Sequence, residues 1–289
     1  MSFEYVNAWI LLAEDEPAGK AYSDPNSCFQ AALRSNVYRS VDMLSMCMTQ
    51  IVPTSEPGTI HVVDGHTLQI NPKPTHPGGL SDQDYMTRLL ADAKHNNPNI
   101  RFLVMLDPAS RNDQISQIFA GCGSNEMDAR AEAFAKNVVA FLRAFGLHGW
   151  EIDWESPISD PENTSKEQFE ALAKGIKGQF ANDYMFVMNT ASTNSLTGEV
   201  VNATVDFLTL QLYADWVKES DYLALGISKS KLAFGATFEA FEGRQQTPED
   251  AYKKASEGGY TIVMQWRLNS RNFQEEQDGQ VKLYTLCKG

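Results

Sequence analysis

The chain has 289 residues, of which 43% are hydrophobic, 10% aromatic and 21% charged, a composition that excludes disordered and fibrous proteins. Its 24 basic residues against 37 acidic ones give a formal charge of -13, and no Lys/Arg cluster is present, which argues against nucleic acid. The longest apolar runs have about ten residues, too short for a membrane span, and the N-terminus lacks the basic region of a signal peptide. We therefore expect a soluble protein with neither nucleic acid nor a membrane as partner. Its compartment stays open between the cytoplasm and export, as a mature form or by a route without a signal.

Four cysteines are scattered along the chain without a CxxC pair or a histidine at metal-binding spacing. This pattern predicts neither a zinc site nor a disulfide framework, so we expect ordinary thiols that are buried at least in part. They are Cys28, Cys47, Cys122 and Cys287.

Short apolar runs alternate with amphipathic stretches along the whole chain, with no linker or internal repeat between them. The apolar runs predict eight strands, at 5–12, 41–52, 100–106, 149–155, 184–191, 205–213, 232–238 and 261–266. The amphipathic stretches predict helices at 26–34, 81–96, 126–145, 165–181, 220–225 and 248–257. Eight strands separated by helices predict an α/β protein with a single (β/α)8 TIM barrel over residues 1–289.

A polar insert rich in proline and glycine, 53–79, follows the second predicted strand. Within it, 60–63 and 67–70 flank the pair Asp64-Gly65, which predicts a β-hairpin. Because loops after barrel strands carry function, this insert is a candidate for shaping substrate choice. We expect its histidines His61, His66 and His76 to be solvated.

The most informative segment is the fourth predicted strand, where acids alternate with two tryptophans and an isoleucine. The acids Glu151, Asp153 and Glu155 therefore share one face, and the apolar set must face the surrounding helices. Three acids about 6 to 7 Å apart inside a barrel repel one another and lose water, which favours protonation of at least one near neutral pH. Such an arrangement costs stability, which indicates a functional use.

Two other interpretations of the acidic face compete with a catalytic one. An exposed edge strand would leave the acids solvated, but it would not place tryptophans on the opposite face. Three carboxylates could also bind Mg²⁺ or Ca²⁺, yet no further Asp or Asn ligands cluster beside them. Catalysis by carboxyl groups remains the favoured interpretation.

Residues 148–155 resemble the D-G-x-D-x-D-x-E strand of glycoside hydrolase family 18, the chitinases and endo-β-N-acetylglucosaminidases. Three further segments fall in the order of that family. Residues 207–213 resemble its sixth strand, which ends in Gln-x-Tyr, and 263–266 resemble its eighth, which ends in a tryptophan. Met188-Asn189 closes a fifth strand.

The resemblance implies a retaining, substrate-assisted hydrolysis of β-linked N-acetylglucosamine, in which the sugar's own acetamido oxygen is the nucleophile. Glu155 would be the general acid and base, Asp153 would orient the acetamido group, and Glu151 would stand for the family's middle Asp. Tyr213 would donate its hydroxyl to the acetamido oxygen. The family needs no cofactor or metal, so we expect none.

Further residues are candidates for binding the sugar. Trp266 offers a flat apolar face at a strand end. The other candidates are Gln211, Asp215, Met188, Asn189 and Trp216.

The chain departs from the family pattern at His148, which replaces the first Asp, and at Ala214, where Asp or Asn is usual after the tyrosine. These departures point to a divergent member. We expect a hydrolase of chitin, chito-oligosaccharides or the N-glycan core. The alternative is a catalytically weak, lectin-like binding protein on the same barrel, in which the acid is typically replaced; here Glu155 is retained.

Overall fold

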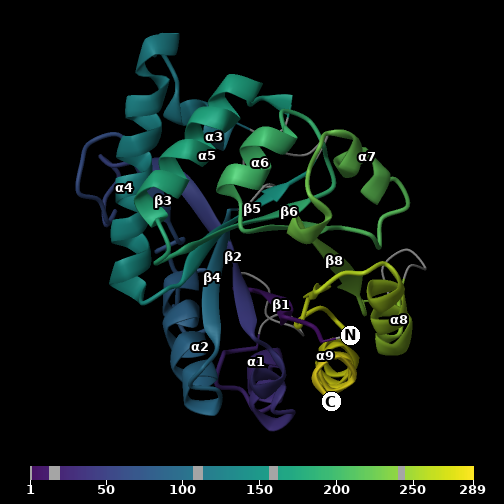
Figure 1. Ribbon diagram of the computed structural model, residues 1–289. Coiled ribbons are helices and arrows are strands. Elements are labelled where there is room, and N and C mark those ends of the chain that lie inside the picture. Colours follow the sequence, from purple (N-terminus) through teal and green to yellow (C-terminus); the bar gives the residue numbers. More distant parts are fainter. Residues whose placement is uncertain (1, 13–19, 107–112, 156–161, 240–244) are drawn as a thin grey trace.

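The computed structural model describes residues 2–12, 20–106, 113–155, 162–239 and 245–289. Eight parallel strands pair in the order β1, β9, β8, β7, β6, β5, β4, β2, and β2 pairs with β1 to close the barrel. This confirms the predicted (β/α)8 barrel (Figure 1). The strands are β1 (Tyr5–Leu11), β2 (Met43–Pro53), β4 (Arg101–Leu106), β5 (Gly149–Trp154), β6 (Met185–Thr190), β7 (Phe207–Leu210), β8 (Leu232–Thr237) and β9 (Ile262–Trp266).

Helices surround this barrel, and several begin at the residues that local chemistry favours. Ser81 and Ser165 form capping boxes, and Thr247 caps a helix that has Pro248 in its first turn. The helices are α1 (Cys28–Arg34), α2 (Asp82–Asn96), α3 (Gln114–Ile118), α4 (Met127–Phe145), α5 (Lys166–Phe180), α6 (Gly198–Thr204), α7 (Glu219–Ala224), α8 (Pro248–Glu257) and α9 (Phe273–Lys288). Short 3-10 turns lie at Val37–Ser40, Ser124–Glu126 and Lys229–Lys231.

The last helix, α9, was not predicted, although it packs against α8 and the turn at Val37–Ser40. Its buried face includes Glu276, Gln277 and Gln280, each at most 1% exposed. An apolar stripe at helical spacing is the usual signal for a helix, and polar residues interrupt it here. The helices α3 and α6, of five and seven residues, were also missed.

The hairpin predicted within the insert is wrong. Residues 60–63 form no strand, and β3 (His66–Gln69) instead pairs antiparallel with Gln50–Pro53, the end of β2. Residues 60–63 find a hydrogen-bond partner on α4 instead. The Oδ1 atom of Asn137 accepts hydrogen bonds from the backbone N–H groups of Val62 and Val63, at 2.8 and 3.0 Å. The end of β2, which extends beyond the barrel, therefore pairs with β3 in place of residues 60–63.

One histidine of the insert is also not solvated. His76 is 8% exposed, its Nε2 lies 2.6 Å from Asp82 Oδ1, and its ring stacks on Tyr85. The insert is thus fastened to the start of α2.

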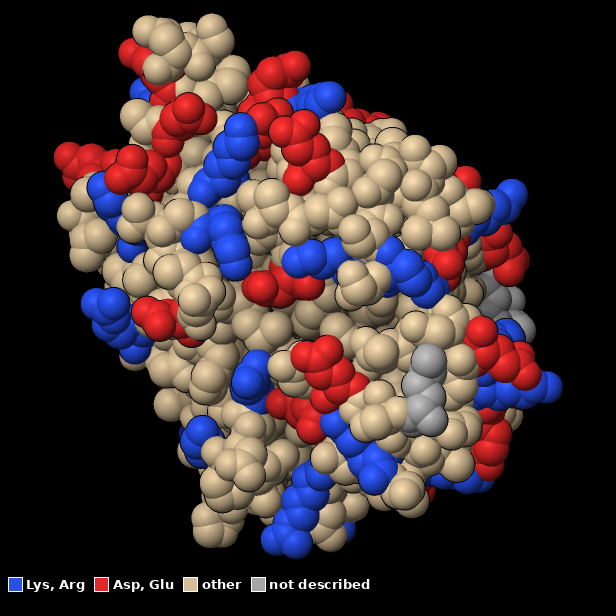
Figure 2. Space-filling model, viewed as in Figure 1, with Lys and Arg blue, Asp and Glu red and all other residues tan. Residues whose placement is uncertain are grey.

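Strand side chains alternate between the helices and the lumen. The lumen below the acids of β5 holds an apolar layer made of Met43, Leu103, Val187, Phe207, Ala233 and Ile262. On the visible face of the molecule, acidic and basic side chains are interspersed (Figure 2). In the described part of the chain, no helix is long and apolar enough to cross a bilayer.

Candidate active site

The three acids lie along β5 and at its carboxyl end, where barrel enzymes place their chemistry. Glu151 and Asp153 are buried within β5, and Glu155, half-buried, follows the strand directly. The residues that alternate with these acids point away from the lumen and pack in the apolar core between the barrel and the helices. They are Trp150, Ile152 and Trp154. The local alternation therefore brings the acids to one face, as the sequence indicated.

Glu151 is the deepest of the three and is completely buried. Its Oε2 accepts hydrogen bonds from Trp9 Nε1, at 3.0 Å, and from Ser45 Oγ. Its Oε1 has no hydrogen-bond partner among the described residues. Burial raises the pKa of Glu151 to about 7, and the two hydrogen bonds oppose that rise.

This shift makes stability depend on pH. The pKa of Glu151 lies near 7 in the folded protein and near its ordinary 4.5 in the unfolded chain. The unfolded state therefore releases the proton first, and Glu151's contribution to stability is lost as pH rises from about 4.5 to about 7. We expect Glu151→Gln to gain stability relative to the wild type across that window, by about 3 kcal/mol. Urea unfolding at pH 4.5 and pH 8 measures this, and a difference that does not change with pH would contradict it.

Asp153 and Glu155 are joined by one side-chain amide. Gln211 Nε2 donates to Asp153 Oδ1 at 3.2 Å and also to Glu155 Oε1. Asn189 Nδ2 donates to the same oxygen of Asp153, at 2.9 Å. Asp153 lies on β5, Asn189 lies on β6, and Gln211 directly follows β7, so the fourth, fifth and sixth strands of the barrel all contribute to a single network.

Burial is the main cause that raises the pKa of Asp153 well above its usual range. The charges of Glu155 and Glu151 and a hydrogen bond with Glu155 act in the same direction, whereas Asn189 opposes them. Asp153 therefore binds a proton more tightly than an exposed aspartate does.

Tyr213 lies in the turn after β7, within electrostatic reach of these acids. Burial, followed by the negative charges of Asp153 and Glu155, raises its pKa well above the ordinary value. The phenol therefore keeps its proton at working pH and can act as a hydrogen-bond donor.

Trp266 ends β9 and is partly buried against an apolar cluster of the lumen that contains Trp9 and Met264. Its ring meets that of Trp9 edge to face, with centroids 5.7 Å apart. Since Trp9 also donates to Glu151, one indole connects the ring of Trp266 with the carboxylate strand. The sequence did not reveal this role of Trp9 or that of Ser45, although both occupy lumen positions of predicted strands.

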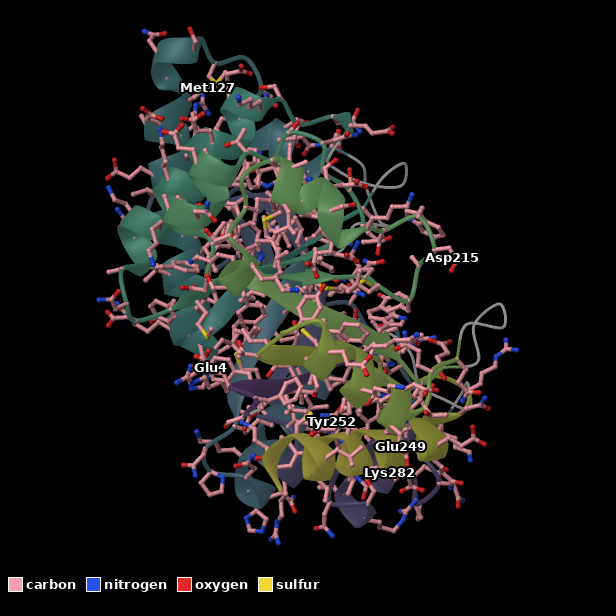
Figure 3. The ribbon with its side chains drawn as sticks, turned by 45° about the vertical axis from the view of Figure 1, so that its right-hand side comes forward. Glu4, Met127, Asp215, Glu249, Tyr252 and Lys282 are labelled. Carbon is pink, nitrogen blue, oxygen red and sulfur yellow. The ribbon has the colours of Figure 1, made fainter. Side chains whose placement is uncertain are left out.

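Three candidate binding residues lie apart from this network. Met188 is buried in the outer core, beneath the helices, because it occupies an outward position of β6. Trp216 is 58% exposed, and Asp215 is exposed on the loop after β7, at the periphery of the molecule (Figure 3).

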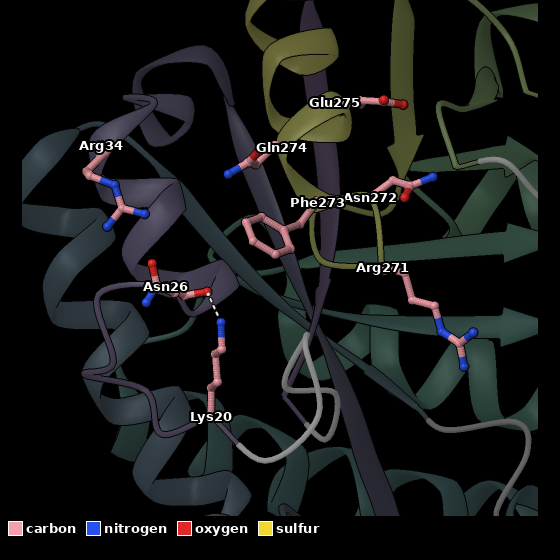
Figure 4. A pocket seen from close by; sticks show the side chains of 8 residues that line it. All are labelled: Lys20, Asn26, Arg34, Arg271, Asn272, Phe273, Gln274 and Glu275. Atoms are coloured by element: carbon pink, nitrogen blue, oxygen red, sulfur yellow. Dashed lines mark hydrogen bonds between the residues drawn. The ribbon is translucent and has the colours of Figure 1, made fainter.

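A cavity of about 380 Å³ lies between the start of α1 and the start of α9 (Figure 4). None of the predicted catalytic residues lines it. Across the described residues, no group of three or more His, Cys, Asp or Glu is arranged to hold a metal ion. The residues that line the cavity are Lys20, Asn26, Arg34, Arg271, Asn272, Phe273, Gln274 and Glu275.

The chain matches the family model described as glycosyl hydrolases family 18 over residues 54–280. It belongs to this family, which confirms the resemblance found in the sequence. Family membership makes it a chitin-related glycoside hydrolase or a chitinase-like protein.

Among curated proteins, probable chitinase 10 of Drosophila melanogaster is 27% identical over 125 residues, which cover 41% of this chain and 5% of that protein. Among solved structures, chitinase ChiW of a Paenibacillus species has a TM-score of 0.66 at 14% identity, over 99% of this chain and 43% of that one. The chain thus spans less than half the length of both proteins. At this identity the structural likeness shows the fold.

Two solved structures are similar over nearly their whole length. The family 18 chitinase ChiB of Flavobacterium johnsoniae has a TM-score of 0.62 at 12% identity, covering 99% of this chain and 94% of that one. The chitinase-like agglutinin of Robinia pseudoacacia has a TM-score of 0.61 at 12% identity, covering 96% and 99%. The same fold therefore occurs in a chitinase and in an agglutinin.

Proposed function

We propose that the protein is a retaining glycoside hydrolase that cleaves β-linked N-acetylglucosamine with the help of the substrate's acetamido group. The observation that carries this proposal is the pairing of Asp153 and Glu155 through the amide of Gln211, close to the protonated phenol of Tyr213. One acid at the strand end and a second carboxyl two residues deeper are what this mechanism requires. The barrel acts as one catalytic domain.

In the first step, Glu155 gives its proton to the glycosidic oxygen as the bond to the anomeric carbon breaks. The acetamido carbonyl oxygen forms a bond to that carbon, which gives an oxazolinium ion. Asp153 accepts a hydrogen bond from the acetamido N–H and stabilises the positive charge, and Tyr213 donates to the acetamido oxygen. Water then attacks the anomeric carbon and gives a proton to Glu155, while the bond between that carbon and the acetamido oxygen breaks and the acetamido group is restored.

Chito-oligosaccharides are the substrate class that the relatives favour. A mutant of a class V chitinase from Cycas revoluta, similar to this chain with a TM-score of 0.63, was solved with (GlcNAc)3. A mutant of a chitinase from the same species, with a TM-score of 0.62, was solved with (GlcNAc)4. In this chain, the apolar ring of Trp266 would support a sugar placed above Asp153.

The test is release of 4-nitrophenol from the 4-nitrophenyl glycoside of chitobiose. The matched control is the cellobioside, which has the same linkage but no acetamido group and should not be cleaved. Proton NMR of the first product should show the β-anomer, and an N-acetylglucosamine thiazoline should inhibit. Cleavage of the cellobioside at a similar rate, or an α-anomer as first product, would overturn the mechanism.

A second candidate function is carbohydrate binding without turnover. The fold shared with the Robinia agglutinin favours it, whereas the presence of Glu155 favours the enzyme. Binding of chitotriose in a calorimeter, with no product after prolonged incubation, would establish the lectin-like function instead.

The hydroxyl of Tyr213 supplies a further prediction. Because the phenol stays protonated, Tyr213→Phe removes a donor to the acetamido oxygen with almost no change in shape. We expect kcat/KM to fall by about 10²-fold, as for loss of one donor to a developing charge. Tyr252→Phe, on α8, is the control and should leave kcat/KM unchanged. A fall of less than about threefold in Tyr213→Phe would contradict the assigned role.

A further inference from the structure

We propose that Glu276 is a positioning residue, which holds the segment 267–272 between β9 and α9 and thereby fixes the ring of Trp266. The inference rests on the proposed function, because in that proposal the ring of Trp266 supports the sugar. Glu276 lies in the first turns of α9 and does not belong to the carboxylate network of β5.

The carboxylate of Glu276 is fully buried and faces back toward the segment it holds. Its Oε2 accepts from the backbone N–H of Ser270 at 2.9 Å, and its Oε1 accepts from Ser270 Oγ. Ser270 Oγ in turn accepts from the N–H of Asn272 at 3.2 Å. Both oxygens of the acid are therefore used to fix one turn of the chain.

Two buried glutamines complete the attachment. Gln265 Nε2 donates to the carbonyl oxygens of Arg267 and Glu276, at 3.0 and 3.1 Å. Gln277 Nε2 donates to the carbonyl oxygen of Leu268 at 3.2 Å. Side chains on β9 and α9 thus bind successive carbonyl groups that follow Trp266.

The same segment is also fastened to the first strand. The N–H of Leu268 donates to the carbonyl oxygen of Trp9 at 2.9 Å. The amide of Asn269 bonds both backbone groups of Leu11, accepting from its N–H at 3.0 Å and donating to its carbonyl oxygen at 2.8 Å. The segment therefore continues the seam between β1 and β9, and Trp266 is held between that seam and the ring of Trp9.

Fixing a loop with a buried carboxylate costs free energy, because removal from water disfavours the charged form. Burial raises the pKa of Glu276 to about 7; Glu239 adds to the rise, and Arg267 and the bonds from Ser270 oppose it. Arg267 is itself paired with Glu239, with 3.2 Å between Nη2 and Oε1. A network in which both carboxylate oxygens are bonded specifies one conformation, which is the property a binding platform needs.

The kinetic test compares three variants. Glu276→Ala removes both acceptors, and we expect KM for the chitobioside to rise about tenfold while kcat changes less than about threefold. Glu276→Gln should restore most of the loss, because its amide oxygen accepts from the N–H of Ser270 and its NH2 can donate to Ser270 Oγ. The control is Gln280→Ala, one turn further along α9. Gln280 is equally buried, but it donates to the carbonyl oxygen of Ser40, at 2.8 Å, away from the segment.

A second readout does not depend on turnover. In protein labelled with 5-fluorotryptophan, the ¹⁹F resonance of Trp266 is identified by its loss in Trp266→Phe. We expect this resonance to shift and broaden in Glu276→Ala, to recover in Glu276→Gln and to stay unchanged in Gln280→Ala. Ser270→Ala, which removes one of the two bonds, should give an intermediate effect if Glu276→Ala does not fold.

The outcomes separate this inference from the proposed function. If the wild type cleaves the chitobioside but Glu276→Ala keeps both its KM and its Trp266 resonance, the positioning role is wrong and the function stands. If the wild type cleaves nothing, the function is wrong, and the Trp266 resonance alone decides the positioning role. Equal rises in KM for Glu276→Ala and Gln280→Ala would show general destabilisation and would also overturn the inference.

Discussion

Glu155→Gln is expected to lower kcat by roughly 10³-fold, because proton donation by a positioned acid contributes between about 10² and 10⁴. The amide has nearly the shape of the acid but carries no proton that it can give to the leaving oxygen. KM should change little, since the fold and the sugar platform are untouched. Initial rates on chitotetraose, whose leaving group is a sugar hydroxyl that needs the proton, measure the effect, with circular dichroism to verify the fold.

The control for this variant is Glu199→Gln, the same chemical change at an exposed position of α6. It should leave kcat unchanged. Full activity in Glu155→Gln would refute the acid and base assignment. The 4-nitrophenyl chitobioside, whose leaving group needs less protonation, should show a smaller loss than chitotetraose.

Asp153→Asn is expected to lower kcat by about 10²-fold, through loss of the charge that stabilises the oxazolinium ion. The hydrogen bonds that Asn189 and Gln211 donate to Asp153 both reach Oδ1, and an amide oxygen can still accept them. The variant therefore removes charge while it keeps the local geometry. Steady-state rates between pH 4 and pH 9 measure both kcat and the change in the pH profile.

The double variant of Asp153 and Glu155 supplies the control for that assignment. Residues that act as one unit give losses that do not add. We therefore expect Asp153→Asn with Glu155→Gln to be scarcely slower than Glu155→Gln alone. Losses that multiply would mean that the two carboxyl groups act independently, in conflict with their shared amide from Gln211.

The barrel could be predicted because each of its strands is marked by a short apolar run in the local sequence. All eight predicted strands are present, and the alternation within 149–155 placed the acids and the tryptophans on opposite faces correctly. The failures arose where long-range pairing decides the outcome. Residues 66–69 pair with the end of β2 rather than with 60–63, and α9 buries glutamines that a hydrophobic pattern does not reveal.

The site was predictable only along a single strand. The order of the acids followed from period-two alternation, but the donors to Glu151 come from β1 and β2, far away in sequence. Which lumen residues meet depends on the stagger of strands around the barrel, and one sequence does not specify that stagger. Met188 shows the same limit: it is adjacent to Asn189 in sequence but points to the opposite side of β6.

The apolar layer beneath the acids has a consequence for how protons reach them. Leu103, Val187 and Phe207 belong to that layer and are at most 2% exposed, so apolar side chains separate the acids from the base of the barrel over most of its section. Asp153 and Glu155 lie between Glu151 and the mouth of the barrel, so a proton that Glu151 exchanges with solvent on that side passes these two acids. The three acids form a row that opens to solvent at the mouth of the barrel. A sugar bound there would restrict the exchange of their protons with solvent until the product leaves.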